Sequence, residues 1–335
     1  MAAFAFSAHA LLAAVIAMLL LLALPTQAWW DKGHMCIAEI ARRNLKPNVQ
    51  SKVQACADVL NKIGPFPKST NIVELGPWAD DLKSMGLYTM STWHFIDTIY
   101  NPQDVKVTIN PVEIVNVASV IPMLISAITS PAATSDIITT SVANLIHFVG
   151  DIHMPLHSAD LFSPEYPLGD LGGNKQIVIV NESAGTSMKL HAFWDSMCEG
   201  PQNNAVRPLD KDAYAELSAF VDNLVKSYSF TEEQMMMTNS TIMAAESYEL
   251  AVKNVYPGIS DRTHMQDEVE VTHTGDTYNY YAFSGVESGA AAGIFLSSFA
   301  IGCLLATAVV LAALYMRRGS SKDERAAAAS ASHGI

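Results

Sequence analysis

Histidine and aspartate recur in five separated stretches of this chain, and this recurrence constrains its fold more than any other feature. The stretches are WWDKGH at 29–34, WAD at 78–80, HF at 94–95, HFVGDIHMPLH at 147–157 and HAFWD at 191–195. His147 and Asp151 are four residues apart, as are His191 and Asp195, which places each pair on one face of a helix. A fold that brings the stretches together would gather many potential metal ligands, because histidine and carboxylate both bind zinc.

One such pair alone has a simpler explanation. A buried carboxylate or imidazole needs a hydrogen-bonding partner, so a single His–Asp pair is more often a satisfied pair in the core than a metal site. His34, Asp80, His94 and His157 add to the two pairs and change this balance. The sequence therefore predicts a site for several zinc ions.

Residues 1–28 have the features of a secretory signal peptide. An apolar run ends at Leu24, and Thr26 and Ala28 are the small residues at positions −3 and −1 of a cleavage site. No Lys or Arg precedes the apolar run, so an uncleaved signal anchor is the alternative. Cleavage after Ala28 would make Trp29 a free amino terminus.

A second apolar segment, at 289–316, predicts a transmembrane helix. The segment carries no charged residue and exceeds the roughly 20 apolar residues that span a bilayer. A buried core helix is the alternative. Arg317 and Arg318 follow it and place that end in the cytoplasm, and the polar tail at 317–335 disfavours a GPI signal. We therefore expect a single-pass type I protein of the plasma membrane with its ectodomain outside.

About 250 residues lie between the two apolar segments, enough for one large domain. We expect this domain at 29–257 and an acidic juxtamembrane stalk at 258–288, where aliphatic residues become scarce. Asn181 and Asn239 begin N-x-Ser/Thr motifs and are predicted glycosylation sites, which agrees with an extracellular address.

The cysteines also agree with an oxidising compartment but do not define a pairing. Cys36, Cys56 and Cys198 lie in the predicted ectodomain and Cys303 lies in the predicted span. A bridge between Cys36 and Cys56 is one candidate. The odd number leaves one thiol over, and no CxxC zinc spacing is present.

The formal net charge of −13 excludes a basic surface that grips nucleic-acid phosphates by counterion release. Bound divalent cations would still reverse the local field in a pocket lined with acids. The sequence contains no sign of a protein partner.

Apolar residues spaced three and four apart predict a mostly α-helical domain. The helices are expected at 34–45, 49–63, 112–129, 135–152, 211–227 and 232–255. A capping box from Thr231 to Gln234 would begin the last of them. One strand, at 176–180, is expected to form a small hairpin with residues near Lys189.

Together these residues resemble the class I zinc-dependent single-strand nucleases of fungi and plants, of which nucleases S-one and P-one are typical. The resemblance covers almost the whole ectodomain and implies the all-α phospholipase C/nuclease fold. With its predicted membrane anchor, the chain is most similar to the 3′-nucleotidase/nuclease group of trypanosomatid parasites.

The resemblance implies three zinc ions, two of which share Asp151. The first ion would be held by Asp80, His94, His147 and Asp151. The second would be held by the amine and carbonyl of Trp29 and by His34 and Asp151. The third would be held by His157, His191 and Asp195.

The implied activity is hydrolysis of single-stranded RNA or DNA to 5′-phosphate products and dephosphorylation of 3′-nucleotides, for purine salvage at the cell surface. Two ions would activate a shared water, with Asp80 and Asp151 as catalytic ligands. Lys83 falls where the family usually has an arginine, and lysine cannot form the same bidentate fork. A solvated helix lysine is the alternative for this residue.

The resemblance also implies a nucleobase pocket. Phe95 would stack on a base, Asp97 would accept a hydrogen bond from it, and Asn174 would line the site. For Phe95 an ordinary core position is the alternative. The glycines before Asn174 are explained by a turn, and His153 occupies no ligand position of the family.

Two other functions remain open from the sequence. A zinc-dependent phospholipase C would share the ligand scaffold and suit a membrane anchor, although its third site usually ends in glutamate rather than an aspartate such as Asp195. A non-catalytic surface protein could use the same residues to bind zinc. Turnover of phospholipid, or zinc binding without any hydrolysis, would identify these alternatives.

Overall fold

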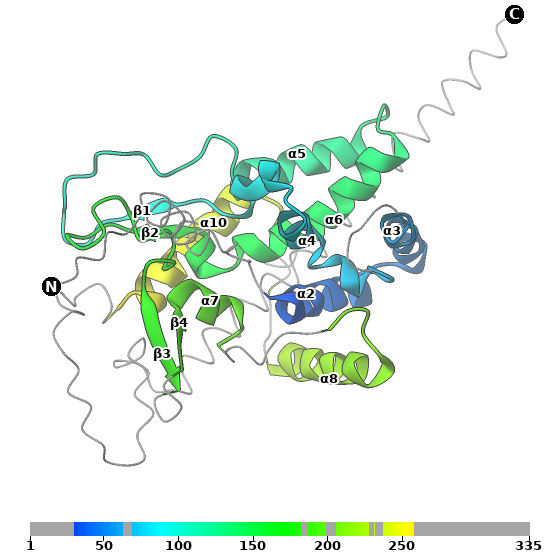
Figure 1. Ribbon diagram of the computed structural model, residues 1–335. Helices are drawn as coiled ribbons and strands as arrows, with labels where there is room; N and C mark the ends of the chain where they lie inside the picture. The colour runs from blue at the N-terminus through cyan, green and yellow to red at the C-terminus, as the bar shows by residue number, and fades with distance from the viewer. Residues whose placement is uncertain are drawn as a thin grey trace, which may run out of the picture.

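The computed structural model describes residues 30–62, 69–181, 186–198, 206–227, 231 and 237–257. These residues form a mostly helical domain with two small sheets, as Figure 1 shows. The predicted signal peptide, stalk and transmembrane segment lie outside them. Within the described part of the chain, none of the helices has the length and apolar character needed to cross a membrane.

Helix α6 (Ser135–Ile152) forms the centre of the domain, with the predicted bounds. Every residue from Ser141 to Ile152 is buried, as expected for a helix that other helices surround. The helices packed against it are α2 (Asp31–Asn44), α3 (Pro47–Leu60), α4 (Trp78–Ser84), α5 (Val117–Thr129) and α10 (Ser240–Leu250). This packing carries His147 and Asp151 into the interior.

Helix α8 (Lys211–Ser227) also has its predicted bounds and lies beside α2 (Figure 1). Glu39 of α2 accepts a hydrogen bond from the Tyr214 hydroxyl of α8 at 3.0 Å, and Arg43 pairs with Asp222 at 2.6 Å. These contacts fix the outer face of α2.

Two helices begin later than predicted because an asparagine caps each of them. The Asn116 side chain accepts hydrogen bonds from the backbone of Ala118 and Ser119, so α5 begins at Val117 rather than at residue 112. Asn239 caps α10 in the same way. Residues 237–239 are not helical, so the predicted continuous helix at 232–255 is wrong, and the π-helical turn η4 (Ala251–Val255) follows α10.

The predicted hairpin is confirmed. Strands β3 (Ile177–Asn181) and β4 (Thr186–Lys189) pair antiparallel, and α7 (Leu190–Asp195) follows β4 directly. The parallel pair β1 (Thr98–Tyr100) and β2 (Ala159–Leu161) was not predicted, because three residues are too few to show a strand period.

Three short 3-10 segments complete the frame. They are η1 (Val73–Leu75), η2 (Tyr88–His94) and η3 (Pro155–His157). The hydrophobic core includes both Cys36 of α2 and Cys56 of α3. Their pairing stays a prediction.

Candidate metal centre

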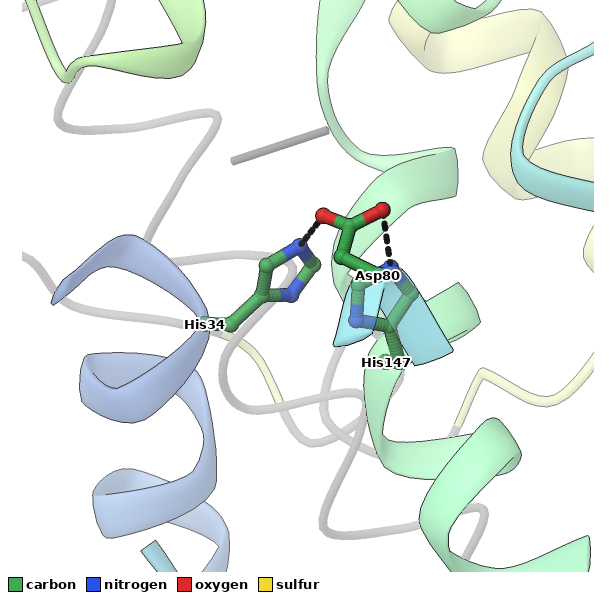
Figure 2. A group of neighbouring side chains, drawn as sticks. All are labelled: His34, Asp80 and His147. Carbon is green, nitrogen blue, oxygen red and sulfur yellow. Dashed lines mark ion pairs between the residues drawn. The ribbon is translucent and has the colours of Figure 1, made fainter. Parts of the chain in front are cut away.

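The predicted ligand histidines and aspartates of the five sequence stretches meet at the centre of the domain, and all of them are buried. They form three groups in which the possible ligand atoms lie within 4.8 Å of one another. The groups are His34, Asp80 and His147; His94, His147 and Asp151; and His157, His191 and Asp195. Figure 2 shows the first group, in which the Asp80 carboxylate lies between the imidazoles of His34 and His147.

The first two groups form one cluster around Asp151. One carboxylate oxygen of Asp151, Oδ1, lies 3.3 Å from His34 Nε2. Its other oxygen, Oδ2, lies 2.9 Å from His94 Nδ1 and 3.1 Å from His147 Nε2. The two oxygens thus face different histidines, which is the arrangement that a carboxylate shared by two ions requires.

Backbone carbonyls fix the orientation of three of the histidines. The Nδ1–H groups of His147, His157 and His191 donate to the carbonyls of Gly76 (2.8 Å), His94 (2.8 Å) and Gly172 (2.7 Å). A carbonyl only accepts hydrogen bonds, so each Nδ1 carries the proton and each ring turns its Nε2 toward the acids, where a neutral ring presents a lone pair. Zinc-binding histidines are commonly held in this way.

The third group contains acceptors without donors. His191 Nε2 lies 3.3 Å from one Asp195 oxygen and His157 Nε2 lies 3.6 Å from the other. Neither Asp195 oxygen receives a hydrogen bond from the described residues. Ligands of a tetrahedral zinc ion are about 3.3 Å apart, given metal–ligand distances of about 2.0–2.1 Å. The residues therefore fit a zinc ion, which would replace mutual repulsion by coordination.

Burial keeps most of these histidines neutral, as metal binding requires. It lowers the pKa of His34 to about 4 and that of His94 to about 3, and it also lowers the pKa of His157 and His191. For Asp195, burial raises the pKa well above its ordinary value. A buried negative charge on Asp195 is unfavourable, and either protonation of its carboxyl group or a bound cation would remove this cost.

Lys83 is part of this buried centre. Its Nζ lies 2.7 Å from Asp80 Oδ1, and its side chain is 8% exposed. Burial raises the pKa of Asp80, but Lys83, His147 and His94 outweigh it, so the pKa lies below its ordinary value. The alternative of a solvated lysine is wrong.

The predicted substrate residues Phe95, Asp97 and Asn174 are all half-buried. Phe95 follows His94 directly and is half-buried, outside the core cluster of the described residues. Burial raises the pKa of Asp97 to about 7. Asn174 is half-buried in the turn before β3, where its side chain donates to Leu171 O at 3.0 Å.

The remaining predicted positions lie away from the three groups or outside the described residues. His153 is buried and its Nδ1 bonds to Val149 O at 2.7 Å, outside every metal group. Asn239 is exposed and caps α10 through its Oδ1, which leaves its amide nitrogen free to carry a glycan. Asn181 ends β3, next to residues that the structure does not describe. Trp29 also lies outside the described residues.

The backbone one residue after Trp29 touches the third group. Trp30 donates its N–H to the carbonyl of Asp195 at 2.9 Å. His34 follows one turn later on α2, so the segment that begins at Trp30 runs directly into the centre.

Arg207 is a positioning residue that the sequence did not reveal. Its guanidinium bonds to Asp31 at 2.8 Å and bidentately to Asp81 at 2.8 and 2.6 Å. Asp31 precedes His34 by three residues and Asp81 follows Asp80, so one buried cation joins the two ligand-bearing helices α2 and α4. No periodic pattern surrounds Arg207, and its partners are distant in sequence.

Replacing Arg207 by lysine should lower the free energy of unfolding by about 1.5–3 kcal/mol, because an ammonium cannot replace the bidentate fork between two buried carboxylates. Thermal denaturation measures this effect. Arg42→Lys is the control, since Arg42 also forms a bidentate pair, with the buried Glu39 three residues away on its own helix, but its side chain is 33% exposed, so the loss should be smaller than for Arg207→Lys. Equal losses in the two variants would contradict the positioning role.

Comparison with known proteins finds similarity to nucleases. A family model described as S1/P1 Nuclease matches residues 29–287. Endonuclease 3 of Arabidopsis thaliana is 26% identical over 257 residues, which cover 71% of this chain and 79% of that protein. Endonuclease 2 of the same plant is 24% identical over 296 residues, which cover 82% and 93%. Endonuclease 5 is 32% identical over 137 residues, which cover 39% and 42%.

Proposed function

We propose, since the chain belongs to the S1/P1 nuclease family, that it is a three-zinc phosphoesterase with both nuclease and 3′-nucleotidase activity. It would hydrolyse single-stranded RNA or DNA to 5′-phosphate products and convert 3′-nucleotides to nucleosides. The observation that supports this most directly is the third group, where His157 and His191 turn lone pairs toward both oxygens of Asp195. The relatives named as endonucleases support a phosphodiester substrate.

The residues would divide among three ions as the family resemblance implies. Asp80, His94 and His147 would hold the first ion, the Trp29 terminus and His34 the second, and Asp151 would be shared between them. His157, His191 and Asp195 would hold the third. Bound zinc would supply Lewis-acid activation of water and stabilisation of charge at phosphorus.

The side chains around the ions have roles of their own. The Lys83 ammonium, fixed by Asp80 at 2.7 Å, would stabilise negative charge that develops on the phosphoryl oxygens. Phe95 would stack on a nucleobase, and stacking accepts any base and favours unpaired strands. Asp97 and Asn174 would supply polar contacts to the bound nucleotide.

The first test compares phosphate release from 3′-AMP and 5′-AMP by the processed, zinc-loaded protein. We expect selective turnover of 3′-AMP that a chelator abolishes. Turnover of phosphatidylcholine without nucleotide turnover would instead identify a phospholipase C. Zinc retention with no phosphoester hydrolysis would identify a zinc-binding surface protein.

We also propose that the enzyme acts at the cell surface, where its nucleoside products would serve purine salvage. The apolar segments at 1–28 and 289–316 and the glycosylation motifs support this location. Protease treatment of intact cells that express the chain is the test, because it should remove 3′-nucleotidase activity without lysis.

The free amine of Trp29 leads to a specific prediction. Adding one glycine before Trp29 should lower kcat by more than about 100-fold, since altering even an indirect partner of a metal costs about 10–100-fold. The zinc content should fall from three ions toward two. Elemental analysis and 3′-AMP turnover measure both effects. An extension at the carboxyl terminus is the control, and full activity of the glycine-extended protein would contradict the N-terminal ligand.

A further inference from the structure

Two fully buried aspartates next to the third group have no part in the function proposed above. Asp160 belongs to β2 and Asp170 to the loop that follows, and both are 0% exposed. Asp160 Oδ1 accepts the N–H of Leu171 at 2.7 Å, and Asp170 Oδ1 accepts the N–H of Leu161 at 2.9 Å. Each acid thus binds the backbone beside the other, and together they tie the loop to the strand.

Asp170 receives more hydrogen bonds than Asp160 does. Asp170 also accepts hydrogen bonds from the Gln176 side chain at 2.6 Å and from the Tyr256 hydroxyl at 3.2 Å. The buried Oδ2 of Asp160 receives none from the described residues. A buried carboxylate without donors is unfavourable, whereas three donors stabilise a charge. The negative charge therefore belongs on Asp170 and a proton belongs on Asp160.

The loop that carries Asp170 packs directly on this acid pair. Gly169 has a φ of +83°, and a Cβ at this position would lie 2.1 Å from Asp160 Oδ2. Three residues later, a Cβ on Gly172 would lie 2.3 Å from Leu156 O. Only glycine fits either position, so the loop lies as close to the acid pair as a backbone can.

The same loop orients a predicted metal ligand. The carbonyl of Gly172 accepts the Nδ1–H of His191 at 2.7 Å and so sets which nitrogen of His191 faces Asp195. Gly172 is two residues from Asp170 and one from Leu171, which are the residues that bond the loop to β2 and to Asp160. A displacement of the acid pair would therefore move the acceptor that holds His191.

We propose that Asp160 is a neutral carboxylic acid beside ionised Asp170, and that this acid pair positions His191 through the loop at 169–173. The assignment of the proton is independent of any metal. The role toward His191 as a zinc ligand rests on the function proposed above.

The surrounding charges agree with this assignment. Burial, then Asp97 and then Asp170 raise the pKa of Asp160 to about 8. The Tyr256 hydroxyl also faces the pair and stays protonated, because burial raises its pKa well above the ordinary value. The Lys175 ammonium binds the carbonyl of Gly169 at 2.5 Å. The N–H of Leu171 favours a charge on Asp160, but burial and the two neighbouring acids outweigh this hydrogen bond.

The two isosteric variants should behave differently. Asp160→Asn keeps an oxygen for Leu171 N–H and, like the neutral acid, carries no charge, so the third zinc affinity and KM should stay within about 3-fold of the parent values. Asp170→Asn replaces an acceptor oxygen by a donor that faces donors, and it should weaken the third zinc by about 10–100-fold. Competition of the full chain with a chromogenic zinc chelator measures both. Equal losses in the two variants, or no loss in either, would overturn the proposal.

Infrared spectroscopy tests the proton itself and needs no zinc or substrate. The carboxylic-acid C=O absorption of the parent protein at neutral pH should lose the contribution of one acid in Asp160→Asn, whereas Asp97 and Asp195, whose pKa values burial also raises, contribute to both spectra. A parent-minus-variant difference spectrum without a C=O band would overturn the proposal. This measurement also decides the matter if Asp170→Asn does not fold. It stays valid if the protein proves not to be a zinc enzyme, so the two proposals can fail separately.

Thermal denaturation across pH gives a second independent readout. The folded protein keeps the Asp160 proton up to about pH 8, whereas an unfolded aspartate loses it near about pH 4. This group therefore makes stability fall as pH rises between those values. Asp160→Asn lacks the effect, so its Tm relative to the parent should rise across this window. A flat difference would contradict a buried neutral acid.

Discussion

Replacing Asp151 by asparagine should abolish phosphoester hydrolysis and leave the domain folded. Asp151 contacts three of the predicted ligand histidines, and its two oxygens face different ones at 3.3, 2.9 and 3.1 Å. Asparagine has the same shape but only one oxygen and no charge, so it cannot serve two ions. We expect kcat for 3′-AMP to fall by more than about 100-fold, beyond the loss that an indirect partner of a metal gives.

Asp136→Asn is the matched control, because Asp136 lies exposed in the first turn of the same helix. It should leave both kcat and zinc content unchanged. Circular dichroism should show equal helix content in the two variants. If Asp151→Asn retained more than about one-tenth of the parent activity, a carboxylate shared by two ions would be excluded.

Helix positions were predictable where burial has a helical period. Helices α6 and α8 have the predicted bounds because their apolar residues repeat along their whole length. The first residues of α5 and α10 could not be predicted in this way. Asn116 and Asn239 set them by capping the helices through a few local hydrogen bonds, and these bonds leave no trace in the periodic pattern of apolar residues.

Ligand types were predictable from sequence, but ligand orientation was not. The carbonyls that hold His147, His157 and His191 come from Gly76, His94 and Gly172, which lie 71, 63 and 19 residues away. A backbone carbonyl has no side-chain signature, so no motif could reveal it. The same reason hid Arg207, whose partners Asp31 and Asp81 lie 176 and 126 residues away.

The three acids of the centre differ in how their charge is compensated. Asp80 has Lys83 at 2.7 Å, and Asp151 lies 3.1 Å from His147, whose pKa Asp151 and Asp80 raise against the effect of burial. Asp195 faces only the lone pairs of His157 and His191. The centre thus has too few positive groups for its buried carboxylates, and it should depend on bound cations for much of the stability of the domain.

Removing zinc should therefore lower the Tm by roughly 16–32 °C. A ligand at about 100 times its Kd stabilises the folded state by about 2.7 kcal/mol, so three ions contribute about 8 kcal/mol. In a domain of this size 1 kcal/mol corresponds to about 2–4 °C. Differential scanning fluorimetry with and without a chelator measures the shift. An unchanged Tm would mean that the clusters are satisfied by hydrogen bonds alone.

Asp195→Asn should lower the Tm relative to the parent protein when zinc is bound and raise it when zinc is removed. With zinc bound, the variant lacks the charged ligand of the third group and should melt below the parent protein. After chelation it should melt above the parent, because the asparagine NH2 can donate to the lone pair of one of the two histidines, His191 at 3.3 Å or His157 at 3.6 Å, where an ionised carboxylate offers only acceptors. A residue needed only for packing would change both forms in the same direction, so this crossing distinguishes a metal ligand from a core aspartate.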